Sequence, residues 1–348
     1  MVDTIDVFYE FSSYTYYNAC YSAIDKIARE KGGQAIHKNG KGKYLTTALA
    51  NIGVLNFRLF KGKCRYCCYM FLQPARLLHA GTHLRLAKAE DCPEILRRLN
   101  EIIASINQIA PHTVLPPIEY WRVSRIDYAV DIETPYVSEY LRLFKAGHIP
   151  PSFSDPEPYD GSFYLKSKNG NINFYDKLQE VREKFGLSDE DIIKELNHLP
   201  DGLMRLEFQS HNRWILHLKK RFSLADTTLP HLLNPTLAWA ELKNRVASII
   251  EEEPFILYDI ASDMLSSSYK NRTALRCCQI MRILKDCPEA NLDVVQETVS
   301  PKKKNDFAQL LHKIRKLGIN PIPLDVAYPH ARKKGDIVTL PNPCAMIS

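Results

Sequence analysis

Apolar and polar side chains alternate along several stretches of the first 215 residues, the pattern of strands with one buried face. The expected strands cover residues 3–11, 55–60, 65–72, 121–132, 162–166, 171–175 and 203–210. The stretches 162–166 and 171–175 flank a turn with Asn169 and Gly170, a dipeptide typical of hairpins. The pattern therefore predicts an antiparallel sheet.

Other stretches repeat apolar residues every three or four positions, which indicates amphipathic helices. These helices are expected over 14–30, 93–107, 137–144, 235–251, 255–265, 273–284 and 305–317, with another capped by Ser188. Beyond residue 252 the pattern is wholly helical. The predicted fold is α+β, with a central antiparallel sheet and flanking helices over residues 1–252, followed by a small helical domain over 253–348.

The composition is that of a globular, moderately basic protein. Hydrophobic residues make up 45% of the 348 positions, and the formal net charge is +6. Basic residues bunch around positions 38–43, 58–65, 219–221, 302–304 and 332–334, which permits a nucleic-acid footprint if they share a face. No secretory signal or membrane span is visible, so a cytoplasmic location without membrane contact is expected.

Three of the expected strands carry polar side chains on one face. The sets are Arg125, Asp127 and Asp131; Asn173, Tyr175 and Lys177; and Arg205, Glu207 and Gln209. Two aspartates and a glutamate suit a hard divalent cation such as Mg²⁺ or Mn²⁺, and a tyrosine beside cations is equipped to attack a phosphodiester. The alternative is a sheet that wets one face, with Asp–Arg pairs lying along it.

These strings, in this order, resemble the Rep_trans-type initiators of rolling-circle plasmids and the related gene II/X-like replication proteins of phages and plasmids. The resemblance covers about residues 55–215 and consists of Arg125–Asp131, Phe163–Lys168 with Ile172–Glu180, and Arg205–Glu207. One departure is that apolar Met70 and Phe71 stand where plasmid relatives tend to carry a glutamate. A His-hydrophobic-His pair is missing from the sequence, which excludes the histidine-metal class of nickases at the level of motifs.

The resemblance implies a replication initiator that nicks and rejoins single-stranded origin DNA. It makes Tyr175 the nucleophile that becomes joined to the 5′ phosphate. It assigns the divalent metal to Asp127, Asp131 and Glu207. Lys177, Arg125 and Arg205 are expected to be catalytic as well, because cations beside the tyrosine would stabilise developing charge and help to lower the pKa of the phenol. Residues 1–252 would then be the catalytic nickase domain, and 253–348 a DNA-binding or accessory domain. Tyr164 on the first hairpin strand is the rival nucleophile. His211, four residues past Glu207, is expected to be an exposed residue at a strand end, with a position near the site as the alternative.

Basic side chains on loops and helices are expected to hold the DNA through its phosphates. They are Lys166, Lys168, Lys219, Lys220, Arg221, Lys313, Arg315 and Lys316. The expected partners are origin DNA, single-stranded or as a hairpin, with a host helicase and polymerase, and a homodimer is left open. Three alternatives stay open: a conjugative relaxase of an integrative element, a non-catalytic DNA-binding regulator, and a metal-dependent nuclease without a covalent intermediate.

Overall fold

The structure is a computed structural model that describes residues 1–31, 35–38, 43–112, 114–154, 161–300, 304–325 and 339–347. The basic residues at 302–303 and 332–334, and Lys41, lie outside this range. Within the described residues the protein is α+β, with a central antiparallel sheet and flanking helices, followed by helices at the C-terminal end. This confirms the predicted fold class.

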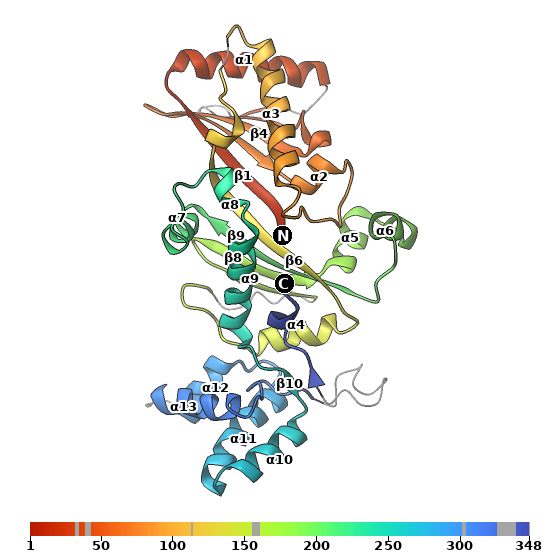
Figure 1. Cartoon of the computed structure of the whole chain (residues 1–348), viewed down its shortest axis with the longest axis vertical. Coiled ribbons are helices and arrows are strands. Elements are labelled where there is room, and N and C mark those ends of the chain that lie inside the picture. The colour runs from red at the N-terminus through yellow and green to blue at the C-terminus, as the bar shows by residue number, and fades with distance from the viewer. Residues whose placement is uncertain are drawn as a thin grey trace. The chain divides into compact units, whose positions relative to one another are not determined.

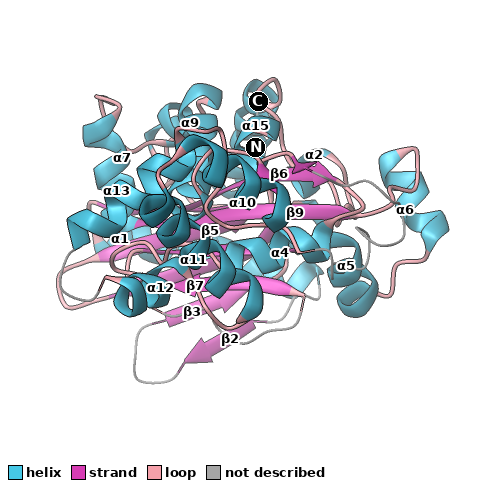
Figure 2. Cartoon of the chain, turned by 90° about the horizontal axis from the view of Figure 1, so that it is seen from below, coloured by secondary structure: helices cyan, strands magenta, loops and turns pink. Residues whose placement is uncertain are grey.

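Nine strands of the described chain form the main sheet, in the order β2-β3-β4-β5-β1-β6-β9-β8-β7. Their bounds are β1 Val2–Phe11, β2 Ala35–Lys38, β3 Lys43–Thr46, β4 Val54–Lys61, β5 Tyr66–Leu72, β6 Arg122–Glu133, β7 Ser162–Lys166, β8 Gly170–Asp176 and β9 Leu203–His211. Every expected strand is present. The short strands β2 and β3, which pair with each other, were not expected (Figure 2).

The predicted helices are all present, and the described chain has further helices that were not predicted. The helices are α1 Tyr14–Lys31, α2 Pro74–Leu78, α3 Cys92–Ile109, α4 Val137–Lys145, α5 Lys177–Phe185, α6 Asp189–Leu196, α7 Asn212–Arg221, α8 Leu229–Leu232, α9 Pro235–Ile250, α10 Tyr258–Ser268, α11 Asn271–Asp286, α12 Leu292–Val299, α13 Lys304–Arg315 and α15 Pro343–Met346. Ser188 caps α6 in a reciprocal capping box with Asp191, as expected. None of the described helices is long and apolar enough to cross a membrane.

The region after residue 252 is not wholly helical. Strand β10, Phe255–Ile256, pairs antiparallel with β11, Thr339–Leu340, and helix α10 begins only at Tyr258. The expected helix over 255–265 was therefore wrong in its first turn. Both residues of β10 are buried, and a short run of buried apolar residues is compatible with a strand as well as with a helix.

The chain forms two compact units whose segments interleave. The first unit contains Met1–Val130, Val181–Leu199 and Glu207–Ala240, and the second contains Asp131–Glu180, Pro200–Leu206 and Glu241–Ser348. The proposed functional boundary at residue 252 stays a prediction.

In the first unit, helices α1 and α3 cover one face of β1 and β5 (Figure 1). The alternation of the strands sets this face: Ile5, Val7 and Phe11 of β1 and Met70 of β5 point to it and are buried. Helix α3 contributes a buried stripe of Ile95, Leu99, Ile102, Ile103 and Ile106. The predicted amphipathic character of this helix is thereby confirmed.

In the second unit, three phenylalanines join α4 to the β7–β8 hairpin. The ring centroids of Phe144 and Phe174 are 4.5 Å apart, and those of Phe163 and Phe174 are 5.7 Å apart. The turn of the hairpin is fixed by Ser167, whose hydroxyl donates to the Gly170 carbonyl at 2.7 Å and accepts from the Gly170 amide at 3.1 Å. The hairpin that carries Tyr175 is therefore held by aromatic packing against α4 and by the hydrogen bonds of its turn.

Candidate active site

Tyr175 is the second-to-last residue of β8, just before helix α5 begins. It pairs directly with Ser162 of β7, and only 8% of its surface is exposed. The neighbouring Phe174 points to the opposite face, where it packs on Phe144, so the alternation of the strand holds Tyr175 away from the phenylalanine cluster. The position of this tyrosine is thus fixed by the hairpin register and by burial.

Lys177 is the first residue of α5 rather than a strand residue. The expectation that it extends the strand face of Asn173 and Tyr175 was therefore wrong, because the chain turns into a helix after Asp176. The lysine still lies close to the tyrosine: its Nζ is 5.9 Å from the centroid of the Tyr175 ring. Lys177 is 5% exposed, and its Nζ lies 2.6 Å from Glu180 Oε2.

Asp176 explains why the helix begins where it does. Its Oδ1 accepts a hydrogen bond from the Gln179 amide at 3.0 Å, the geometry of an N-terminal cap. The Tyr-Asp-Lys string therefore lies where the strand passes into the helix. Tyr175 is near the end of β8, Asp176 caps α5, and the Lys177 ammonium lies over the tyrosine ring.

Tyr164, the rival nucleophile, lies on the same face of the hairpin as Tyr175. It pairs with Asn173, and the Lys166 Nζ lies 5.4 Å from its ring centroid. The expected cross-strand placement is confirmed. Unlike Tyr175, it sits in the middle of a strand and not beside a helix N-terminus.

Asp131 and Arg205 form a two-pronged ion pair in the second unit. The Arg205 Nε lies 2.7 Å from Asp131 Oδ1, and its second nitrogen lies 2.8 Å from Oδ2. Arg205 is fully buried, whereas the Asp131 side chain is 23% exposed. In the order of strands within the sheet, β9 with Arg205 stands between β6 with Asp131 and β8 with Tyr175.

Arg125 and Asp127 form the matching pair in the first unit. The Arg125 Nε lies 2.9 Å from Asp127 Oδ1, and the Thr4 hydroxyl also donates to this carboxylate. Asp127 is completely buried, and burial raises its pKa although Arg125 opposes the shift. The predicted sharing of one face by these two residues is confirmed.

Glu207 and Gln209 also share a face, as predicted. The Gln209 Nε2 donates to Glu207 Oε1 at 2.8 Å, and Glu207 acts electrostatically on Arg125. His211, the last residue of β9, is half-buried rather than exposed as expected. Its pKa is lowered by burial and by the positive charge of Arg125.

The predicted metal ligands were tested against this geometry. Both oxygens of Asp127 and of Asp131 accept hydrogen bonds from an arginine, and Glu207 accepts from Gln209. These oxygens fit carboxylate–guanidinium and carboxylate–amide pairs better than a shared cation. Among the described residues, no group of three His, Cys, Asp or Glu side chains is placed to hold a metal. The divalent ion stays a prediction.

The predicted DNA-contacting residues are divided between the two units. Lys219, Lys220 and Arg221 form the last turn of α7 in the first unit. In the second unit, Lys166 and Lys168 are exposed beside the hairpin turn, and Lys316 is exposed just beyond α13. Lys313 is only partly exposed, and Arg315 is paired with Glu251 at 2.7 Å. Arg315 is therefore held by the protein itself.

Two polar partners of these networks were missed by sequence reasoning. Asp6 of β1 binds Arg58 of β4, and Glu180 of α5 binds Lys177. The pair Glu180–Lys177 has a helical spacing of three that could have revealed it. Asp6 and Arg58 are 52 residues apart, and no local signal connects them.

In comparisons with known proteins, no family model, no curated protein and no solved structure matches the chain.

Proposed function

We propose that this protein is a rolling-circle replication initiator that nicks and rejoins single-stranded origin DNA, with Tyr175 as the nucleophile. The observation that carries the proposal is the junction of β8 and α5, where Tyr175, the helix-capping Asp176 and the lysine above the ring follow one another. It also rests on the resemblance of the three polar strings to the initiator family. A conjugative relaxase would use the same chemistry at a transfer origin.

The proposed reaction is a transfer of one phosphodiester bond. The Tyr175 oxygen attacks phosphorus, the bond to the 3′ oxygen breaks, and the 5′ phosphate stays on the tyrosine. The phenol proton passes to solvent, and the departing 3′ oxygen takes up a proton to become a hydroxyl that primes synthesis. Attack by that hydroxyl reverses the step and rejoins the strand.

Two local features favour negative charge at this place. The Lys177 ammonium near the ring stabilises charge that develops on the phenol oxygen and the phosphate. The N-terminus of α5, which begins at Lys177, adds the positive end of a helix dipole. Glu180 orients the lysine through their 2.6 Å contact.

The test incubates the purified protein with end-labelled single-stranded DNA that spans its candidate origin, and resolves the products on a denaturing gel with and without protease. Wild type is expected to give a protein-linked 5′ fragment, which Tyr175→Phe abolishes while DNA binding is kept. Tyr164→Phe is the matched control, because it removes a hydroxyl from the same hairpin face. An adduct that survives in Tyr175→Phe and is lost in Tyr164→Phe would reverse the assignment.

The same assay tests the metal. Loss of the adduct on chelation with EDTA, and its return with Mn²⁺ or Mg²⁺, is what the family resemblance predicts. An adduct that forms equally well in EDTA would discard the divalent ion as a cofactor.

A second candidate is a non-catalytic DNA-binding regulator. It is favoured by the ion pairs, because both oxygens of Asp127 and of Asp131 accept hydrogen bonds from an arginine, as carboxylates with a purely structural role would. This candidate predicts DNA binding without adduct in wild type, under every metal condition.

A further inference from the structure

One face of the sheet in the first unit carries aromatic and arginine side chains in alternation. We call this the aromatic face, and define it by Phe8 of β1, Arg58 and Phe60 of β4, Arg65 of the β4–β5 connection, and Tyr69 and Phe71 of β5. Strand periodicity places them together, because Tyr69 and Phe71 are two apart, as are Arg58 and Phe60. The helices lie on the other face, where Phe11 packs against Tyr17 of α1.

The register aligns a row of side chains across five strands, β3, β4, β5, β1 and β6. Leu45 of β3 pairs with Arg58, Arg58 with Tyr69, and Tyr69 with Phe8. Phe8 then pairs with Arg122 of β6. Two stacked aromatic rings thus stand in the middle of a row, with an arginine on either side.

The contacts within the aromatic face fix these rings without covering them. Phe8 and Tyr69 are stacked with centroids 5.6 Å apart, and the Arg58 guanidinium lies 5.2 Å from the Tyr69 centroid. Arg65 lies 5.9 Å from the Phe8 centroid, and Arg125 lies 5.6 Å from that of Phe71. Phe8, Phe60, Tyr69 and Phe71 all remain partly exposed. Large aromatic side chains held in this way on an uncapped strand face form a stacking platform.

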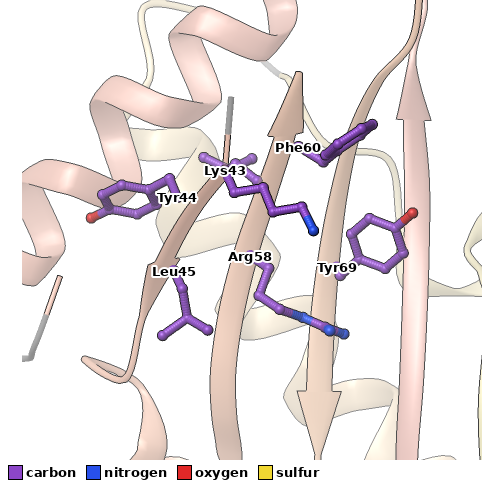
Figure 3. Close-up of a pocket in the computed structure, with 7 residues that line it drawn as sticks. Lys43, Tyr44, Leu45, Arg58, Phe60 and Tyr69 are labelled. Atoms are coloured by element: carbon purple, nitrogen blue, oxygen red, sulfur yellow. The ribbon is translucent and has the colours of Figure 1, made fainter. Parts of the chain in front are cut away.

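A pocket opens on this face between β3, β4 and β5 (Figure 3). Lys43, Arg58, Phe60 and Tyr69 line it from three neighbouring strands. Two polar atoms beside it, Arg58 Nε and Asn56 Oδ1, are buried without a hydrogen-bond partner among the described residues. Unsatisfied buried donors and acceptors are costly unless a ligand completes them.

The charge around the aromatic face favours a polyanion. Two acidic residues lie beside the aromatic face, and each is paired with an arginine: Asp6 with Arg58, and Glu10 with Arg65. The exposed Lys43, whose Nζ lies 6.0 Å from the Phe60 ring centroid, and the exposed Lys63 at the hairpin tip add positive charge. Aromatic rings interleaved with cations are the combination that binds the bases and phosphates of a single strand at once.

We propose that the aromatic face binds single-stranded DNA, with successive bases stacked on Tyr69, Phe8 and Phe60 and phosphates held by the neighbouring lysines and arginines. A duplex would not fit this chemistry, because its bases are already stacked on one another. The choice of DNA over RNA rests on the proposed function. The stacking surface itself rests on the register and contacts of the first unit.

The test measures binding of a fluorescein-labelled strand of about 15 thymidines, a length that one such domain covers, by fluorescence anisotropy. It uses the full chain carrying Tyr175→Phe, so that cleavage does not interfere. Tyr69→Leu and Phe8→Leu keep apolar volume but remove the ring, and each is expected to weaken binding by about fivefold to a hundredfold. Tyr69→Phe, which keeps the ring, is expected to bind as the parent does.

The controls separate stacking from misfolding. Tyr120→Leu removes an aromatic ring that is 70% exposed in a turn outside the strands, and is expected to leave binding unchanged. Circular dichroism confirms the fold of each variant. Unchanged affinity in folded Tyr69→Leu and Phe8→Leu would overturn the proposal, even if wild type forms the Tyr175 adduct. Tighter binding of the matching uridine strand would overturn DNA as the ligand. If Tyr69→Leu and Phe8→Leu bind more weakly but wild type forms no adduct, the result would count against the nickase proposal and not against the aromatic face.

Discussion

The ion pair of Asp131 with the fully buried Arg205 is expected to contribute strongly to the free energy of unfolding. Asp131→Ala would remove the carboxylate that accepts two hydrogen bonds from the buried Arg205 guanidinium. We expect a loss of about 3 kcal/mol in the free energy of unfolding, because removing one partner of a buried ion pair is costly. Urea denaturation measures it.

The control for this prediction is an exposed ion pair. Arg97→Ala in α3 removes a pair with Glu94 whose side chains are 55% and 38% exposed, and should change stability by about 1 kcal/mol or less. Equal effects of the two substitutions would contradict the described burial of the Asp131–Arg205 pair.

His211 gives the protein a pH-dependent contribution at the residue scale. Its folded pKa lies below the ordinary 6.5, so the unfolded chain binds more protons on this residue than the folded chain does between those two values. Stability is therefore expected to fall as the pH drops through and below 6.5. His211→Gln should flatten that part of the curve, as followed by urea midpoints between pH 5 and pH 7.5. A curve that keeps its slope in the variant would assign the effect to other groups.

At the scale of elements, Asp176 joins strand to helix. Asp176→Ala removes the cap of α5 and is expected to cost about 1 kcal/mol, whereas Asp176→Asn keeps an acceptor and should cost little. We also expect Asp176→Ala to reduce adduct formation, because it loosens the turn that holds Lys177 near Tyr175. If the destabilised Asp176→Ala protein formed the adduct as well as wild type does, the Asp176 cap would contribute to stability but not to the reaction.

Most elements could be predicted because their periodicity is local. Helix α3 carries its apolar stripe without interruption, and β6 has the buried apolar residues Ile126, Tyr128 and Val130 at alternate positions. The α5 start was mistaken because Lys177 continues the alternation of β8, and only the Asp176 cap ends the strand. The two-residue strand β10 is too short for any period to register.

The site was predictable only in its parts. Alternation along one strand correctly grouped Arg125 with Asp127, and Glu207 with Gln209. Sequence could not reveal that Asp131 pairs with Arg205, 74 residues away, because that depends on which strands become neighbours. The aromatic face was missed for the same reason: Phe8, Arg58 and Tyr69 come together only through the register of three strands.

At the scale of the whole molecule, the proposed function requires a salt-sensitive hold on DNA. Lys220 is exposed in the last turn of α7 and was predicted to contact phosphate. Lys220→Ala is expected to reduce the slope of log affinity against log salt by about 0.7 to 0.9, the value for one lost phosphate contact. Lys26→Ala is the control, because Lys26 has an exposed side chain on α1, and it should leave the slope unchanged. An unchanged slope in both variants would remove Lys220 from the DNA-binding surface.

The measurement that tests the central claim most directly is mass spectrometry of the protein after reaction with its candidate origin strand. The account predicts a peptide that contains Tyr175 and carries the 5′-phosphorylated DNA fragment, absent in Tyr175→Phe and present in Tyr164→Phe. Unmodified Tyr175 in a reaction that yields free, protein-less 5′ phosphates would contradict covalent catalysis, and DNA binding without any cleavage would favour the regulator.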